Sequence, residues 1–566
     1  MINWWTLLLL SFGYVMLLFA IAYWGDNEEQ RRFSPFSRSL IYSLTLAVYC
    51  TSWTFYGAVG SAAENGWIYL PIYLGPMIVI SFGWPMINRI VTVSKRQNLT
   101  SIADFIAARY GKARSLAVLI TLIATIGSVP YIALQLKAVV AGFSIVSDYR
   151  FAGGPEYDTA LIVATALAVF AILFGTRKID VTEHHEGMML AIAFESVVKL
   201  FAFVTVGVFA VLLLGNNADA GEITRTAARA DTLFRFDHLP DTFITQLILA
   251  SAAIFCLPRQ FHVAIVEAHR DANVRSARIW FPLYLLVFSA FVIPITIAGL
   301  KLLPSGVFSG DAFVLALPME SGQGWLTILA FLGGFSAATG MVIVATVALS
   351  TMISNEIVMP LLLRIKYLHL RERRDYSRLL LHIRRGAIGG ILILAYFYYL
   401  ATDQSAALAS IGLLSFAAAA QFAPLIILGL YWPRATRVGA ISALSTGFVL
   451  WAYTLFLPAM ARSGALGAAF IEEGLFGAAW LRPEALFFDF LGNPLTHGVA
   501  WSLTANTVVL ITVSLLTRQS MIEKIQARAF TSPVPGRSDS RALPAGHKLT
   551  NADLRALADQ FLGEAH

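Results

Sequence analysis

The chain has 566 residues, of which 57% are hydrophobic and 13% are charged, with a net charge of +7 and a mean hydropathy of +0.69. A soluble domain is nearer to half apolar and a quarter charged, so the composition excludes an ordinary water-exposed surface. Apolar runs of about 20 residues recur between charged or Gly/Pro-rich segments, as a bilayer core about 30 Å thick requires. The sequence therefore predicts an integral membrane protein.

The apolar runs predict about thirteen membrane-spanning helices. The first run is read as an uncleaved span, because it lacks a basic start and a small-residue cleavage site. The expected spans are 4–24, 39–60, 67–88, 115–145, 158–175, 187–214, 243–262, 279–303, 325–352, 385–401, 406–431, 438–458 and 497–517.

The basic residues mark the topology. The connecting segments, taken together with the span ends that border them and with the tail from 518, fall into two alternating sets, one with 32 Lys and Arg residues and the other with 7. Arg259 is counted in the first set, in segment 259–278. The positive-inside rule places the richer set in the cytoplasm, the N-terminus in the periplasm and the C-terminus in the cytoplasm. The net positive charge is thus a topology signal, and no nucleic-acid partner is expected.

The tail, residues 518–566, differs in character from the membrane domain, residues 1–517. It begins as a charged helix, continues as a Ser/Pro/Gly-rich linker and starts a new amphipathic helix at Thr550. Soluble domains seldom consist of one helix, so the tail is expected to be the start of a cytoplasmic signalling module that this chain does not include. Segment 459–496 is expected to be an external loop with a short interfacial helix.

Two spans contain residues that favour a break near the middle of the membrane. Transporters commonly bind solutes at such breaks, because interrupted helices expose backbone groups. Pro258 interrupts the span 243–262, and polar and bulky residues fill "VYCTSWTFYGAVG" in the span 39–60. Helix packing by small and polar residues is the alternative for either span alone. The candidate solute-binding residues of these spans are Cys50, Thr51, Ser52, Trp53, Tyr56, Phe255 and Cys256.

Three charged residues, Lys137, Glu195 and Lys199, lie well inside predicted spans, away from the span ends. Such residues are paired or line a cavity, because an uncompensated charge in the bilayer is costly. Glu195 and Lys199 are four residues apart and are expected to neutralise each other, either as a structural pair or in gating and proton handling. Lys137 has no oppositely charged residue on neighbouring turns, so it joins Tyr131 and Gln135 as a candidate in the solute path.

Neither metal nor catalytic chemistry is expected. The cytoplasmic segment "GTRKIDVTEHHEG" carries acidic and histidine residues at a helix entrance, where acidic side chains favour the helix dipole, and it lacks HxxxH-type spacing. The chain contains no GxxxxGK[ST], GxSxG or HExxH run. Cys50 and Cys256 lie in spans, so no disulfide is implied. We expect no cofactor and no enzyme activity in this chain.

Five strings give the chain a family resemblance: "VYCTSWTFYGAVG", "PYIALQLKAV", "FGTRKIDVTEHHEGMMLAIAFESVVKL", "LPRQFHVAIVEAHRDANVRSARIWFPLYLL" and "STMISNEIVMPLLLR". They resemble the sodium:solute symporter family and, more narrowly, the transporter-like input half of CbrA-type sensor histidine kinases, over residues 1–530. The resemblance implies a LeuT-type inverted repeat of five plus five helices at about 39–431, with one span before and two after. In the sensor branch a histidine kinase follows, whereas this chain has no kinase motifs.

The family's second sodium site implies a set of ion-binding positions in this chain. The backbone carbonyls correspond to Ala47 and Cys50 on the first repeat helix, and the eighth helix contributes Ala337, Gly340 and Met341. The family's usual Ser/Thr pair falls on Gly340 and Met341, which have no hydroxyl.

The coupling ion therefore stays open between proton and sodium. The absent hydroxyls favour coupling to a proton carried by Glu195, or binding without coupling. A sodium site shifted onto Ser336 and Thr339 is the alternative. Tyr49 stands where the proline-transporting branch has an acidic residue.

The sequence thus predicts a symporter-like domain of the bacterial inner membrane. We expect it to transport or sense a small polar solute, an amino acid such as histidine, and to serve as the input of a two-component sensor kinase. The alternative is a transport-inactive sensor that only signals. The expected partners are the solute, the lipid bilayer and a cytoplasmic kinase module or response-regulator pathway. The broken spans and buried charges disfavour a purely structural scaffold.

Overall fold

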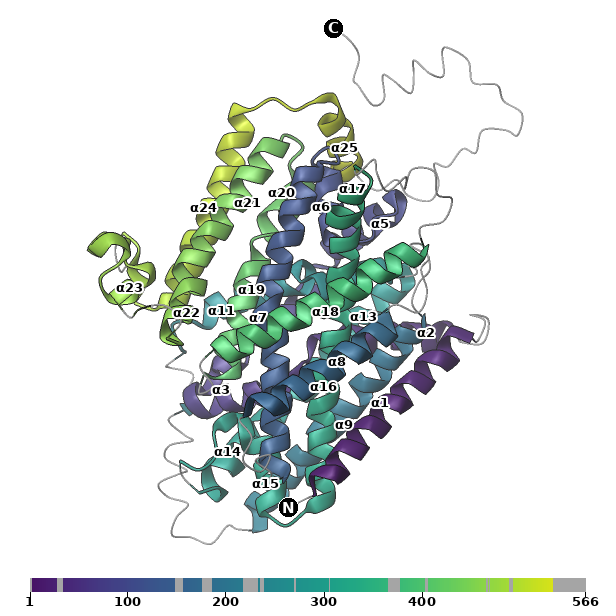
Figure 1. Ribbon diagram of the computed structural model, residues 1–566, viewed down its shortest axis with the longest axis vertical. Coiled ribbons are helices and arrows are strands. Elements are labelled where there is room, and N and C mark those ends of the chain that lie inside the picture. The colour runs from purple at the N-terminus through teal and green to yellow at the C-terminus, as the bar shows by residue number, and fades with distance from the viewer. Residues whose placement is uncertain are drawn as a thin grey trace.

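The computed structural model describes residues 3–27, 34–147, 156–175, 186–216, 233–234, 239–268, 271–304, 306–364, 377–402, 406–464, 467, 469–487 and 492–532. All regular secondary structure in these ranges is helical, so the predicted all-α membrane fold is confirmed. Figure 1 shows the helices running at various tilts along the long axis of the molecule, with α7 (Arg114–Ser147) passing through most of its length.

Within the described ranges, nine helices are long and apolar enough to cross a bilayer, and two bent pairs raise the number to eleven. Several of the nine continue across short irregular turns. They are α1 (Trp4–Asn27), α7, α9 (Glu186–Asn216), α13 and α14 (Asp271–Ala290, Val292–Leu302), α16, η7 and α17 (Gly324–Met352, Ile353–Val358, Met359–Leu362), α18 (Ser377–Ala401), α19 and α20 (Leu408–Ala420, Ala423–Tyr431), α21, η10 and α22 (Arg437–Trp451, Ala452–Phe456, Leu457–Arg462) and α24 (Pro494–Leu516).

The other predicted spans also fall on helices, but they are interrupted or short. The span 67–88 becomes α4 (Pro71–Ser81) and α5 (Trp84–Gln97), bent by 69°. The span 243–262 becomes α11 (Phe243–Cys256) followed by α12 and η5 (Pro258–Phe261, His262–Val266), bent by 50°. The span 39–60 is divided among α2 (Pro35–Leu46), η2 (Ala47–Tyr49), η3 (Trp53–Gly57) and α3 (Ala58–Asn65), and the span 158–175 is α8 (Glu156–Gly175).

Shorter helices complete the described structure and lie mainly at the two ends of the bundle. They are η4 (Gly66–Tyr69), α6 (Ile102–Arg109), η6 (Gly310–Ala312), α15 (Phe313–Glu320), α23 (Ala469–Glu472), η11 (Leu475–Gly477), η12 (Ala479–Leu481), η13 (Pro483–Ala485) and α25 (Met521–Thr531). The short helix expected between residues 459 and 496 is α23, which stands outside the bundle beside α22 (Figure 1).

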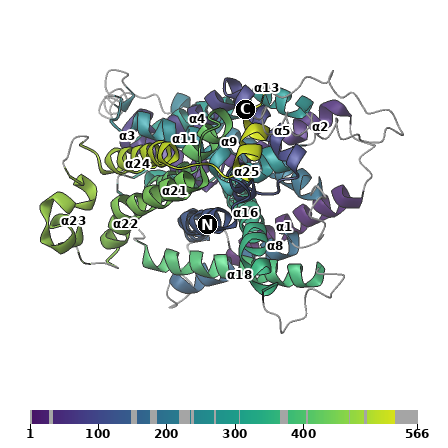
Figure 2. The same cartoon turned by 90° about the horizontal axis from the view of Figure 1, so that it is seen from above.

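The core of the bundle is α16. In its most apolar stretch 83% of the residues are buried inside the protein, against 28% for α18 and for α24. Figure 2 shows α16 within the bundle, α18 along one edge, and α21 with α24 along another. Large apolar side chains such as Leu9, Ile279 and Leu516 point outward and are 69–85% exposed, as a hydrocarbon environment permits.

The two ends of the described chain lie at opposite ends of the long axis. The start of α1 is at the bottom of Figure 1, and α25 is at the top. The charged helix predicted at the start of the tail is α25, whose Ser520 and Glu523 form a capping box. The amphipathic helix expected from Thr550 lies outside the described residues.

The charge asymmetry predicts that the α25 end faces the cytoplasm. A reporter enzyme that is active only in the cytoplasm should be active when fused after Gln519 and silent when inserted in segment 215–242. Activity measured in intact cells, normalised to the amount of fusion protein, tests this orientation. The reverse pattern would invert the topology and place α25 in the periplasm.

Candidate functional site

The first broken helix exposes backbone carbonyls in the middle of the protein. The α2 helix ends at Leu46, one tight turn follows, and Cys50 adopts an extended conformation before the helix resumes. Cys50 and the following Thr51 and Ser52 are almost completely buried. The carbonyl oxygens at this break therefore need hydrogen-bond donors from other helices, because no water-exposed surface is near.

The second broken helix lies at the corresponding place in the other half of the chain. Leu257 is extended, with φ −68° and ψ 129°, and Pro258 begins the short α12 helix. Proline has no N–H and disfavours helical geometry in the residue before it, so the sequence explains the break directly. This outcome agrees with the expectation for Pro258.

Side chains from both broken helices and from α7 meet in a buried cluster. The Tyr131 and Thr51 hydroxyls are 2.8 Å apart, and the Gln135 side-chain carbonyl accepts a hydrogen bond of 3.2 Å from the Ser52 amide. The ring of Trp53 lies edge-on to Tyr131, with centroids 6.3 Å apart. The structure therefore brings five of the predicted solute-binding residues together, and we call them the junction cluster.

Two further residues belong to this cluster, and sequence reasoning missed both. Phe416 of α19 stacks on Tyr131, with ring centroids 5.6 Å apart, and packs against Trp53 at 4.9 Å. The guanidinium carbon of Arg259 lies 4.3 Å from the Tyr131 ring centroid. Arg259 directly follows Pro258, and this position in a breakable span was the signal that could have identified it.

Arg259 is buried, and its charge is uncompensated by hydrogen bonds. Its side chain is 2% exposed, and none of its guanidinium nitrogens has a hydrogen-bond partner among the described residues. The charge count above had assigned Arg259 to a cytoplasmic connecting segment, which is wrong. A buried guanidinium is costly without an acceptor, and an anionic group within its reach would satisfy it.

The remaining predicted solute-binding residues lie outside the junction cluster. Tyr56 packs on Gly334 of α16, where an added Cβ would meet the Tyr56 hydroxyl at 1.8 Å. Phe255 and Cys256 are buried at the end of α11. Lys137 is six residues beyond Tyr131, or about 9 Å along α7, and donates to the Ala406 carbonyl at 2.5 Å. A role for Lys137 in the solute path stays a prediction.

The Lys199 side chain donates hydrogen bonds to the backbone carbonyls of the first broken helix. Its ammonium nitrogen lies 2.6 Å from the Ala47 oxygen and 2.8 Å from the Cys50 oxygen, and its side chain is 3% exposed. These are the two carbonyls that the family resemblance assigned to a sodium ion. In this chain a covalently attached cation from α9 binds them.

Glu195, one turn earlier on α9, is held by α16. Its Oε1 accepts a hydrogen bond of 3.0 Å from Thr339, and its backbone oxygen accepts one of 3.2 Å from Ser336. The hydroxyl of Tyr14 on α1 donates in turn to Ser336 at 2.8 Å. Ser336 and Thr339 are the candidates for a shifted sodium site, and both hydroxyls lie within hydrogen-bonding distance of Glu195. The Thr339 hydroxyl is also 3.0 Å from the Phe335 carbonyl of its own helix.

Gly340 makes room for the Glu195 carboxylate. A Cβ at Gly340 would lie 2.3 Å from Glu195 Oε2. The missing hydroxyl at this position is therefore replaced by a carboxylate that comes from another helix. Ala337 and Met341, the other implied positions on α16, are each 2% exposed.

Glu195 and Lys199 were expected to neutralise each other, and a role for them in gating or proton handling stays a prediction. In the described part of the chain the two side chains form no direct ion pair, and each binds a different helix. They remain close enough to interact electrostatically. Through these two residues α9 contacts both neighbours: Lys199 binds the first broken helix, and Glu195 binds α16.

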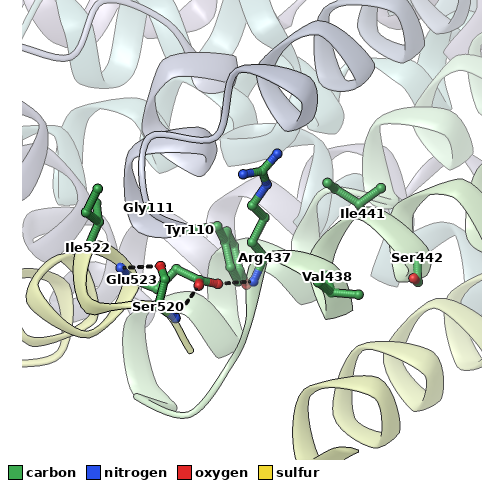
Figure 3. Close-up of a pocket in the computed structure, with 9 residues that line it drawn as sticks. All are labelled: Tyr110, Gly111, Arg437, Val438, Ile441, Ser442, Ser520, Ile522 and Glu523. Carbon is green, nitrogen blue, oxygen red and sulfur yellow. Dashed lines mark hydrogen bonds between the residues drawn. The ribbon is translucent and has the colours of Figure 1, made fainter. Parts of the chain in front are cut away.

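A cavity of about 450 Å³ lies elsewhere, where α25 meets α21 and the turn after α6. Figure 3 shows Glu523 at its edge, hydrogen-bonded to Ser520 and to the backbone of Arg437. The Glu523 carboxylate is thus already bound by backbone groups, so the cavity is a joint between α25 and the bundle and is separate from the junction cluster. Most of the acidic and histidine segment near the start of α9 lies outside the described residues.

Comparison with known proteins relates the chain to symporters. No protein-family model matches it. The sodium/pantothenate symporter of Escherichia coli (strain K12) is 23% identical over 464 residues, which cover 78% of this chain and 88% of the relative. The solved structure of a Na⁺-coupled sialic acid symporter in a substrate-bound outward-open state matches with a TM-score of 0.63 at 14% identity, over 91% of this chain and 98% of that chain. The nucleobase-cation-symport-1 family transporter Mhp1 matches with a TM-score of 0.45, at 14% identity and over 87% and 96% of the two chains.

The fold is therefore that of a symporter, as the resemblance implied, and the chain is a multi-pass membrane protein. The identities to the solved structures are low, so the shared fold leaves the solute and the coupling ion to be argued from this chain's own residues.

The fit between Gly340 and Glu195 predicts a stability effect. Gly340→Ala should lower the melting temperature of the purified protein, because overpacking a core typically costs about 1–3 kcal/mol. Gly386→Ala in α18 is the matched control, since no atom of another described helix lies within 4 Å of a Cβ built there. The melting temperature of the double variant Glu195→Ala/Gly340→Ala should fall by less than the sum of the decreases in the two single variants. Additive losses would show that the two residues do not share this space.

Proposed function

We propose that this chain binds a small carboxylate-bearing solute, an amino acid such as histidine, at the junction cluster and carries it across the bacterial inner membrane. The observation that carries the proposal is Arg259 on the second broken helix, a buried guanidinium without a hydrogen-bond acceptor among the described residues. The symporter-like sequence and fold support transport as the activity.

The chemistry of the cluster suits such a solute. A carboxylate accepts two parallel hydrogen bonds from a guanidinium and cancels its charge, which removes the cost of burying Arg259. The rings of Trp53, Tyr131 and Phe416 provide an aromatic wall, against which an imidazole side chain can stack. The Ser52 hydroxyl is also buried without a hydrogen-bond partner in the described structure, and it is a candidate contact for the solute's amino group.

Sensing is the second candidate function, and a row of aromatic rings supports it. Phe530 of α25 lies 5.2 Å from Phe105 of α6, and Phe105 lies 5.5 Å from Phe261, two residues after Arg259. Arg89 fixes α25 further by two hydrogen bonds to the Phe530 carbonyl, of 3.0 and 2.8 Å. A shift of α12 on solute binding would therefore reach α25, from which a kinase module could be controlled. Spatial continuity alone does not measure this coupling, so it needs a test.

The solute proposal predicts that Arg259→Gln weakens histidine binding by about 30-fold or more, because truncating one partner of a buried charge pair costs about 2 kcal/mol or more. Uptake of radiolabelled histidine into proteoliposomes measures the effect. Histamine, which lacks the carboxylate, should compete poorly with histidine for the wild-type protein and almost equally well for the variant. Arg278→Gln is the matched control, since Arg278 is exposed and, within the described ranges, donates a hydrogen bond to the Ser81 carbonyl alone.

The outcomes separate the two functions. Histidine-dependent thermal stabilisation without uptake would favour the transport-inactive sensor. In that case Phe530→Ala should leave histidine binding intact and reduce signalling by a full-length kinase fusion. A wild-type protein that binds no amino acid, or an Arg259→Gln variant that transports histidine normally, would contradict the proposed solute site.

A further inference from the structure

We propose that the Lys199 ammonium is a built-in cation, which takes the place of a free sodium ion on the carbonyls of the first broken helix. The inference concerns this cation position and goes beyond the proposed solute site. It rests on the two short contacts from Lys199 to the Ala47 and Cys50 oxygens and on the burial of the lysine.

The position has the composition of a cation site. Carbonyl oxygens of an interrupted helix, a carboxylate and hydroxyl groups are the oxygen ligands that hard cations prefer. The carbonyls of Ala47 and Cys50 face α9, Glu195 supplies the carboxylate, and Thr339 supplies a hydroxyl. The ammonium of Lys199 donates to both carbonyls, and the Glu195 carboxylate with its Thr339 partner begins one helical turn away along α9.

Three sequence features compensate one another here. Lysine brings the positive charge, Glu195 balances it from the same helix, and Gly340 leaves the space that the carboxylate needs. A serine or threonine at position 340 would collide with Glu195. The α16 helix thus lacks the family's two hydroxyls, and α9 supplies an ammonium and a carboxylate in their place.

The charge balance also argues against an additional free cation. Among the described residues, the groups that act electrostatically on the ammonium are the Cys50 thiol on the broken helix, Glu195 on its own helix and Arg259 on α12. With Cys50 as a neutral thiol, the charged groups are two cations and one anion. A bound carboxylate would make this set neutral, whereas a sodium ion would add a second uncompensated positive charge in a poorly screened interior. Sodium is therefore excluded both by occupancy and by repulsion.

Removal of the ammonium should open the position to sodium. Purified wild-type protein should melt at the same temperature in sodium chloride and in choline chloride of equal ionic strength. Lys199→Ala should show a saturable, sodium-specific rise of about 2 °C, because a ligand that binds only the folded state stabilises it. The double variant Lys199→Ala/Glu195→Ala should lose this rise, and Lys137→Ala, which removes a lysine outside the position, should not gain it.

Two results would overturn the proposal. One is a saturable sodium-specific stabilisation of the wild-type protein, or binding of ²²Na⁺ to it. The other is a folded Lys199→Ala variant that does not respond to sodium. If Lys199→Ala does not fold, Lys199→Gln replaces it, and the wild-type ²²Na⁺ measurement decides on its own. None of these readouts uses the solute, so failure of the histidine proposal would leave this inference standing.

Discussion

The contact between Lys199 and the broken first helix is the interaction on which the centre of the molecule depends. A helix that stops in the middle of a membrane protein leaves carbonyl oxygens without intrahelical donors, and each unsatisfied group there is expensive. The ammonium satisfies two of these oxygens at once. It also requires a counter-charge, which fixes Glu195, and the Glu195 carboxylate requires the space above Gly340. The positions of α9, α16 and the broken helix are therefore linked through one buried charge.

The fold was largely predictable because the bilayer imposes a simple length rule. Runs of apolar residues located the spans, and Pro258 located one of the two breaks, since proline removes a backbone donor. The bend between α4 and α5 was missed, although Gly83 and Pro85 stand at the point where the chain turns. Hydropathy averages over a window, so it finds a span but does not find its bend.

The site was only partly predictable, because its contacts join residues far apart in the sequence. The spacing of Glu195 and Lys199 indicated mutual pairing, and that is the local solution available to an isolated helix. In the folded protein, Lys199 instead binds the carbonyls of the broken helix, and Glu195 binds Thr339 of α16. Arg259 was misassigned for a related reason, since an arginine at a helix break and an arginine in a loop look alike in one dimension. Gly340 suggested a lost ligand, and only the structure shows the carboxylate that fills its place.

A covalently attached cation at this position bears on whether solute binding can be coupled to a sodium gradient. A sodium ion that enters and leaves with the solute transfers the free energy of its gradient, whereas a lysine cannot leave. If Lys199 replaces the ion as proposed, no sodium gradient acts through this position. The broken helix is then held in place whether or not sodium is present, and binding of the solute becomes the main event that alters the charge around Arg259. A protein built in this way would respond to the concentration of its solute and ignore that of sodium. Such a response would suit the sensor function proposed above, and the ring contacts from Phe261 through Phe105 to Phe530 connect α12 with α25.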